Sequence, residues 1–166
     1  SGTVGTERPV RSGQTGRVGL GARAHHFGRR RWNGWVDESI HDELPSGGAA
    51  AIDRVVGPAT RPRDATLAEV VAAVPAPLLP RHRLVVDDAE VRVRHARGQS
   101  LPDWLALRTG RLDAVPDGVA FPGDAAEVRE LLAWATAVGA RVIPYGGGTS
   151  VVGGVTPTAD GAPWLT

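Results

Sequence analysis

The sequence predicts an α+β fold, in which a short helical N-terminal region, 29–112, precedes a strand–helix–strand unit within residues 113–166. Three features predict it. Capping residues mark short helices in the first region. In the second region, one helical pattern lies between two short apolar stretches. The second stretch runs into a glycine-rich loop, and the carboxyl end of a strand is where open α/β sheets commonly bind ligands.

The first two expected helices are short. One spans residues 49–55. Thr66 is expected to cap the other, over residues 67–74, because Glu69 at the third helical position completes a capping box and Pro75 ends the helix.

A third helix is expected over residues 101–108. Ser100 precedes it as a cap, Asp103 stands at its third position, and Gly110 closes it. Residues 84–86 form a brief extended stretch between the second and third helices.

The strand–helix–strand unit begins with an apolar stretch over residues 119–122. Asp124 can cap the helix that follows, and Glu127 completes a capping box. Gly139 stops this helix, and residues 141–145 are expected to form the next strand, since parallel strands need such a crossover. The expected apolar face of the helix consists of Val128, Leu131, Leu132, Ala135 and Val138.

The loop over residues 144–154, P-Y-G-G-G-T-S-V-V-G-G, is poor in side chains. Glycine accepts φ > 0 and lets another group approach the backbone closely. Successive N–H groups can then point into one concavity that suits a phosphate or pyrophosphate. The expected contacts are Gly146, Gly147, Gly148, Thr149 and Ser150, with Pro144 and Tyr145 positioning the loop entry and Gly153 and Gly154 letting the chain pass close to the ligand.

Two familiar anion-binding patterns do not fit this loop. A P-loop needs a lysine after its glycines, and the chain contains no lysine. A dinucleotide fingerprint needs G-x-G-x-x-G at the start of a helix, but neither Gly146 nor Gly148 starts such a register, and residues 156–161 have no helical pattern. Two options remain. One is a hairpin-like bend between the strands of a flavin-binding fold other than the dinucleotide fold, and the other is a structural glycine turn.

The loop motif resembles the pyrophosphate loop of FAD-linked oxidases of the vanillyl-alcohol-oxidase type, which have a PCMH-type FAD-binding domain. Residues 31–38, R-W-N-G-W-V-D-E, resemble the W-N-G-W-G signature of alkyldihydroxyacetonephosphate synthases, from which Val36 departs. Residues 94–103 and 107–110 are similar to the segment ahead of the flavin domain in that family.

The resemblance implies FAD as the cofactor, bound non-covalently, because Thr149 stands where some relatives attach the flavin through a histidine. It implies a truncated domain, because the family's proteins are much longer, and hence an inactive fragment. The implied function of the parent enzyme is exchange of the acyl group of acyl-dihydroxyacetone phosphate for a fatty alcohol in ether-lipid synthesis. Two alternatives stay open: an FAD-dependent 2-hydroxy-acid oxidase or dehydrogenase of the D-lactate or glycolate type, and a non-enzymatic fragment without stable cofactor binding.

No catalytic residue and no metal ligand can be nominated in this chain. The scattered histidines lack the spacing of metal ligands: His25, His26, His41, His82 and His95. Structural hydrogen bonding is expected of the R-H-A-R segment 94–97, and core packing of Trp32 and Trp35. The arginines at 29–31 are expected to be solvated.

Composition limits the cellular setting. The 19 basic and 18 acidic residues leave a net charge of +1, which argues against a nucleic-acid-binding module. Cysteine is absent, which excludes disulfides and thiol chemistry. No apolar run approaches the ~20 residues of a membrane span. We expect a cytoplasmic enzyme for a small-molecule substrate, a homodimer at full length, with residues 1–28 as a flexible tail.

Overall fold

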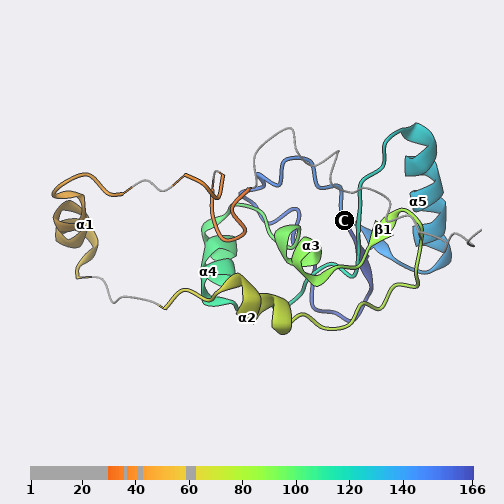
Figure 1. The fold of residues 1–166 in the computed structure, drawn as a ribbon, viewed down its shortest axis with the longest axis horizontal. Coiled ribbons are helices and arrows are strands. Elements are labelled where there is room, and N and C mark those ends of the chain that lie inside the picture. Colours follow the sequence, from red (N-terminus) through yellow and green to blue (C-terminus); the bar gives the residue numbers. More distant parts are fainter. Residues whose placement is uncertain (1–29, 36, 41–42, 59–62) are drawn as a thin grey trace, which may run out of the picture.

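The computed structural model describes residues 30–35, 37–40, 43–58 and 63–166. In chain order its elements are α1 (Gly48–Val56), α2 (Leu67–Ala72), β1 (Val85–Val86), α3 (Ala89–Arg94), α4 (Leu101–Thr109), β2 (Val119–Ala120), α5 (Ala125–Ala137), β3 (Arg141–Val142) and β4 (Trp164–Leu165). Helices dominate the chain before β2, and a strand–helix–strand order follows (Figure 1). The structure confirms the α+β prediction, while the expected tail, 1–28, lies outside the described residues.

The caps predicted for α2 and α4 are present. The Thr66 hydroxyl accepts a hydrogen bond from Glu69 N, and the Glu69 carboxylate accepts one from Thr66 N, at 2.8 Å. Ser100 and Asp103 form the same reciprocal pair at the start of α4. Each pair satisfies two of the N–H groups that a helix start leaves unbonded. α2 ends at Ala72, two residues earlier than the pattern predicted.

The cap of α5 differs in detail from the prediction. One Asp124 carboxylate oxygen accepts from Ala126 N at 2.8 Å and from Glu127 N at 2.9 Å. The Glu127 carboxylate bonds to Gly123 N rather than to the cap residue's own N–H. The predicted reciprocal box is therefore wrong, because Glu127 reaches one residue further back. The helix stops as predicted, with Gly139 at φ +70°.

The buried face of α5 is narrower than the apolar spacing predicted. Leu131 and Ala135 are buried against Leu165 of β4. Val128 and Leu132, expected on the same face, are 41% and 49% exposed. Partly buried apolar side chains complete the cluster: Leu79, Leu84, Val85, Ala120, Trp134 and Ala140.

β4 separates the two strands of the strand–helix–strand unit. β1 pairs antiparallel with β2, and β3 pairs parallel with β4. A parallel bridge between Gly118 and Leu165 joins the two pairs, and Thr166 N donates to Gly118 O at 3.0 Å. The spatial order is thus β1, β2, β4, β3. The crossover through α5 leaves room for one strand between β2 and β3, and the chain returns to fill it.

α3 was not expected as a helix, and its inward side is charged. Asp88 caps it by accepting from Val91 N at 3.0 Å. Arg92 is 2% exposed, and its guanidinium donates to Pro116 O at 2.7 Å and to Pro75 O at 2.8 Å. These bonds give two of the nitrogens of the buried guanidinium an acceptor, while Nη2 has none among the described residues. They connect α3 to the segment after α2 and to the entry of β2.

α1 lies apart from the other elements, at the left of Figure 1. None of its residues is buried. The apolar side chains of its amphipathic sequence, Ile52, Val55 and Val56, are exposed. Within the described ranges, no helix combines the length and the apolar character needed to cross a bilayer.

Candidate functional site

The glycine-rich loop, residues 144–154, follows β3 and leads to β4 with no helix between them. Because β3 and β4 are parallel, the loop belongs to a crossover connection. The hairpin-like bend expected from the sequence is therefore wrong. The absence of a helix after the loop agrees with the exclusion of a dinucleotide fingerprint, which places its glycines at a helix start.

The loop presents unbonded backbone amides. Between Tyr145 and Gly153, no backbone N–H donates a hydrogen bond to another described residue. The loop instead closes through its end: Gly154 N donates to the Ser150 hydroxyl oxygen at 3.0 Å. Gly146 and Gly147 are exposed. Such a run of N–H groups can serve as a ligand-binding surface for an anion.

Gly148 occupies a position that no other residue fits. Its φ is +64°, and a Cβ there would lie 2.1 Å from Arg30 Nη1 and 2.5 Å from the Tyr145 hydroxyl oxygen. By contrast, a Cβ at Gly146 would meet nothing within 4 Å. Gly153 has φ +75° and equally open surroundings. The loop is therefore tight beneath Gly148 and open at Gly146 and Gly153.

Tyr145, at the entry of the loop, is half-buried, while Pro144 beside it is exposed. The Tyr145 hydroxyl donates to Arg97 O at 2.9 Å, and Arg94 O lies 3.3 Å away. Burial raises the pKa of Tyr145 above its ordinary value, so the phenol keeps its proton at neutral pH and can donate. This contact joins the loop to the end of α3.

The other end of the loop is held by the segment between α3 and α4. Gln99 N donates to Ser150 O at 2.6 Å. Gly98 allows this approach, since a Cβ there would lie 2.3 Å from Ser150 O. The Thr156 hydroxyl donates to Asp103 Oδ1 at 3.2 Å. The R-H-A-R-G-Q motif and the glycine loop, far apart in the sequence, thus form one structural unit.

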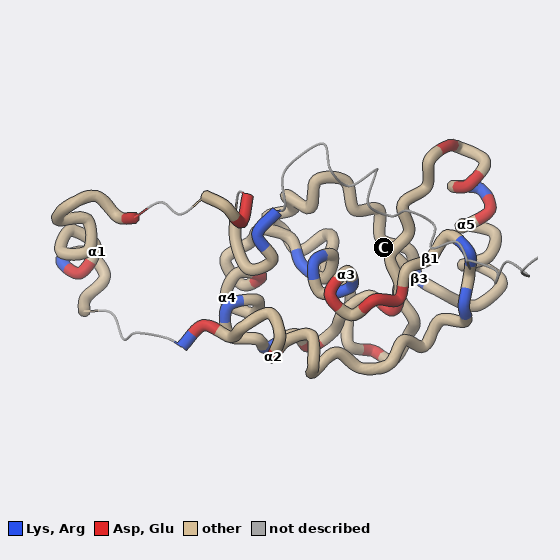
Figure 2. Tube along the Cα trace, in the orientation of Figure 1, with Lys and Arg blue, Asp and Glu red and all other residues tan. Residues whose placement is uncertain are grey.

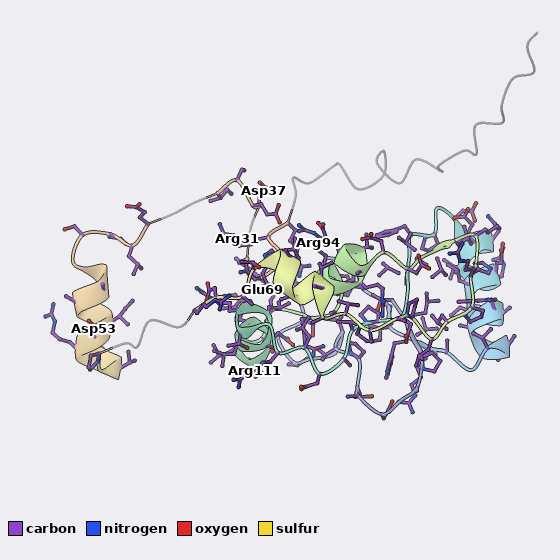
Figure 3. The ribbon with its side chains drawn as sticks, turned by 60° about the horizontal axis from the view of Figure 1, so that its bottom comes forward. Arg31, Asp37, Asp53, Glu69, Arg94 and Arg111 are labelled. Carbon is purple, nitrogen blue, oxygen red and sulfur yellow. The ribbon has the colours of Figure 1, made fainter. Side chains whose placement is uncertain are left out.

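Arg30, which directly precedes the R-W-N-G-W motif, also contacts the glycine loop. Arg30 Nη1 donates to Gly147 O at 3.0 Å, and its guanidinium lies 5.7 Å from the centre of the Tyr145 ring. Arg30 O in turn accepts from Arg94 Nη1 at 2.8 Å. Figure 3 shows the segment that carries Arg31 and Asp37 beside Arg94. The expectation of solvated arginines is wrong for Arg30, and no local signal could have predicted a contact across 117 positions.

The tryptophans and histidines only partly follow expectation. Trp35 packs edge-on against Trp104 of α4, with ring centres 6.4 Å apart, but it is 49% exposed and so is not core. Trp32 is half-buried. His25, His26 and His41 lie outside the described residues. In the part of the chain that the structure covers, His, Asp and Glu side chains do not gather in threes that could hold a metal ion.

One pocket among the described residues lies away from the loop. It has a volume of about 310 Å³, opens between α2 and α4, and is lined by Arg63, Ala65, Glu69, Val70, Thr109 and Gly110. Arg63 and Glu69 form an ion pair with each other. None of these lining residues belongs to the glycine loop, whose Gly146 and Gly147 are exposed.

His95 lies between the rings of Phe121 and Tyr145, with centre distances of 5.4 and 5.0 Å. Its Nδ1 is 2.7 Å from Val91 O. Burial lowers the pKa of His95 and outweighs the raising effect of this hydrogen bond. The positive charges of Arg30 and Arg94 lower the pKa further. The ring is therefore neutral at pH 7 and belongs to the loop's support.

This lowered pKa predicts a loss of stability in acid. An unfolded histidine takes up its proton near pH 6.5, but the folded protein resists protonating His95, so stability is complete above about pH 6.5 and falls as the pH drops below it. Urea unfolding between about pH 7.5 and 5.5 measures the slope, and His95→Gln should flatten it. Equal slopes in the two proteins would contradict the prediction.

Comparison with known proteins relates part of the chain to a known domain. Residues 116–162, which include the whole glycine-rich loop, match the family model of the FAD binding domain. This part of the chain is therefore similar to part of an FAD binding domain.

The relatives narrow the resemblance. Alkyldihydroxyacetonephosphate synthase of Dictyostelium discoideum is 34% identical over 74 residues, which cover 45% of this chain and 12% of that protein. The protein of the same name from Trypanosoma brucei brucei is 36% identical over 70 residues, covering 42% and 11%. A solved structure of alkyldihydroxyacetonephosphate synthase shares the fold, with a TM-score of 0.64 and 21% identity over 82% of this chain and 31% of its own. The matched part of the chain therefore spans about an eighth of the curated relatives' length.

Proposed function

We propose that the glycine loop binds the diphosphate and ribityl chain of FAD, in an enzyme that resembles alkyldihydroxyacetonephosphate synthase. One observation carries the proposal. The backbone N–H groups from Tyr145 to Gly153 donate no hydrogen bond to any described residue. The match of residues 116–162 to an FAD binding domain supports it independently.

The chemistry of the loop fits a diphosphate. Hydrogen bonds to charged groups contribute roughly 1.5–3 kcal/mol each, so several amides together can hold the anion. We assign the amides of Gly146, Gly147 and Gly148 to this role, with Thr149 and Ser150. The Ser150 hydroxyl accepts from Gly154 N and keeps its own hydrogen for the ligand. The glycines at 153 and 154 leave room beside it.

The flavin supplies the electron-transfer or carbon chemistry, and this chain supplies binding and orientation. The reaction we propose for the whole protein is exchange of the acyl group of acyl-dihydroxyacetone phosphate for a fatty alcohol. It rests on the relatives that share 34% and 36% identity. A cytoplasmic homodimer is the expected form. Oxidation of a 2-hydroxy acid is the second candidate, and a fragment without cofactor the third.

Flavin binding is the first test. The full-length protein is purified and titrated with FAD, and quenching of the flavin fluorescence reports binding. Acid precipitation should then release the flavin into the supernatant, because Thr149 offers no nucleophilic nitrogen for a covalent bond. Flavin that stays with the precipitate would contradict the non-covalent assignment, and unquenched fluorescence at saturating protein would contradict FAD binding.

Product analysis separates the two enzymatic candidates. The FAD-loaded full-length protein is supplied with acyl-dihydroxyacetone phosphate and a fatty alcohol, and in parallel with D-lactate or glycolate and an artificial electron acceptor. Release of fatty acid together with an alkyl product supports the first reaction, whereas reduction of the acceptor by the hydroxy acid supports the second.

A further inference from the structure

We propose that Arg30 supplies the positive charge of the diphosphate site, by turning its guanidinium from the Gly147 carbonyl to the bound diphosphate. The inference rests on the proposed function and assigns to the site a side chain outside the loop. It also gives the segment before α1 a role in cofactor binding.

Arg30 lies against the exposed glycines of the loop. Its Nη1 donates to Gly147 O at 3.0 Å, next to the exposed Gly146. Gly148 makes the approach possible, because a Cβ there would lie 2.1 Å from Nη1. A guanidinium carries five donors, and this carbonyl takes one of them, so donors remain for an anion bound at the loop.

The charge of Arg30 has no partner within the described residues. Its neighbour Arg94 is paired with Glu38 at 2.8 Å and with Glu90 at 2.9 Å. Arg108 is paired with Asp64 at 2.6 Å. No described carboxylate forms an ion pair with Arg30, although acidic residues occur in several parts of the described chain (Figure 2).

The groups in contact with the guanidinium are uncharged, while the nearby carboxylates of Glu38 and Glu90 are paired with Arg94. Burial keeps His95 neutral by lowering its pKa and keeps Tyr145 protonated by raising its pKa. Asp103 lies toward the other end of the loop, where its two oxygens accept from the hydroxyls of Thr156 and Ser100.

The backbone of Arg30 is held by hydrogen bonds, and its guanidinium has no charged partner among the described residues. Arg94 Nη1 donates to Arg30 O at 2.8 Å, and Arg30 forms an antiparallel bridge with Asp37. The side chain itself contacts only neutral groups, Gly147 O and the Tyr145 side chain. Hydrogen bonds between arginine and phosphate are stronger than those to a neutral carbonyl, so a bound diphosphate would take the guanidinium at little cost.

The test compares two flavins in four forms of the full-length protein. FAD has a diphosphate and riboflavin has none, so only FAD can respond to a charge at the diphosphate site. The forms are wild type, Arg30→Gln, Arg30→Lys and Arg31→Gln. Arg31 is the matched control, because it is the adjacent cation and donates to Ile40 O rather than to the loop. Affinities come from fluorescence quenching, and thermal unfolding verifies that each variant is folded.

Arg30→Gln is expected to lower the affinity for FAD by about 10- to 100-fold, the effect of losing a charge-assisted hydrogen bond. The affinity for riboflavin should stay unchanged. Arg30→Lys retains the charge and should recover most of the affinity. Added salt should lower the FAD affinity of Arg30→Gln less than that of wild type, since one charge contact is missing in the variant. Arg31→Gln should bind both flavins as wild type does.

Two results overturn the inference while leaving FAD binding intact. In one, Arg30→Gln binds FAD as well as wild type does. In the other, Arg30→Gln lowers the affinities for FAD and riboflavin equally, which indicates that Arg30 only shapes the loop. If wild type fails to bind FAD, the proposed function falls and this inference falls with it.

Discussion

Gly148→Ala should reduce FAD affinity at least tenfold and lower the free energy of unfolding. Gly148 has φ +64°, where an alanine costs about 1–2 kcal/mol. The added methyl would also meet Arg30 Nη1 at 2.1 Å and the Tyr145 ring carbon at 2.6 Å. The Tyr145 ring cannot withdraw without losing its hydrogen bond to Arg97 O. The loop must therefore shift, and its amides shift with it. Fluorescence titration and urea unfolding measure the two effects.

Gly161→Ala is the matched control. Gly161 has a similar backbone, with φ +80°, but a Cβ there would meet nothing within 4 Å. This variant should show the backbone strain alone and bind FAD as wild type does. If Gly148→Ala binds FAD normally, or if both variants lose affinity equally, the geometry of the loop does not govern cofactor binding.

Asp117→Ala should destabilise the fold by roughly 2–5 kcal/mol, since each buried N–H left unpaired costs about 1–3 kcal/mol. Asp117 is 7% exposed. One of its oxygens accepts from Leu78 N and the other from Trp164 N, both at 2.8 Å. The carboxylate thus joins the segment before β1 to β4. Urea unfolding of the full-length protein at pH 7 measures the loss.

Asp160→Ala serves as the comparison for this change. Asp160 is exposed and pairs with Arg141, and exposed ion pairs contribute little. We expect an unfolding curve close to that of wild type. Equal losses in the two variants, or none in Asp117→Ala, would show that the buried carboxylate does not hold β4 in place.

The features that the sequence predicted well are local ones. Thr66 with Glu69, and Ser100 with Asp103, sit within one helical turn, so their spacing alone determines the hydrogen bonds. Gly139 ends α5 for an equally local reason, its positive φ. The glycine loop was found in the same way, because its composition permits few other roles.

The features that the sequence missed depend on contacts between distant segments. Residues 91–94, V-R-V-R, alternate as a strand would, yet they form the end of α3, where Arg92 finds carbonyl partners at Pro75 and Pro116. The strand order could not be predicted, since strands of two residues carry no period. The contact of Arg30 with the loop likewise has no signal in local composition.

Hydrogen–deuterium exchange of residues 144–154, with and without bound FAD, most directly tests whether the loop amides hold the diphosphate. The amides of Gly146 to Ser150 have no acceptor among the described residues, so they should exchange fast in the protein without flavin. With FAD bound, their exchange should slow by at least tenfold, while riboflavin should slow it much less. If FAD binds and this loop exchanges as fast as before, the diphosphate lies elsewhere and the proposal is wrong.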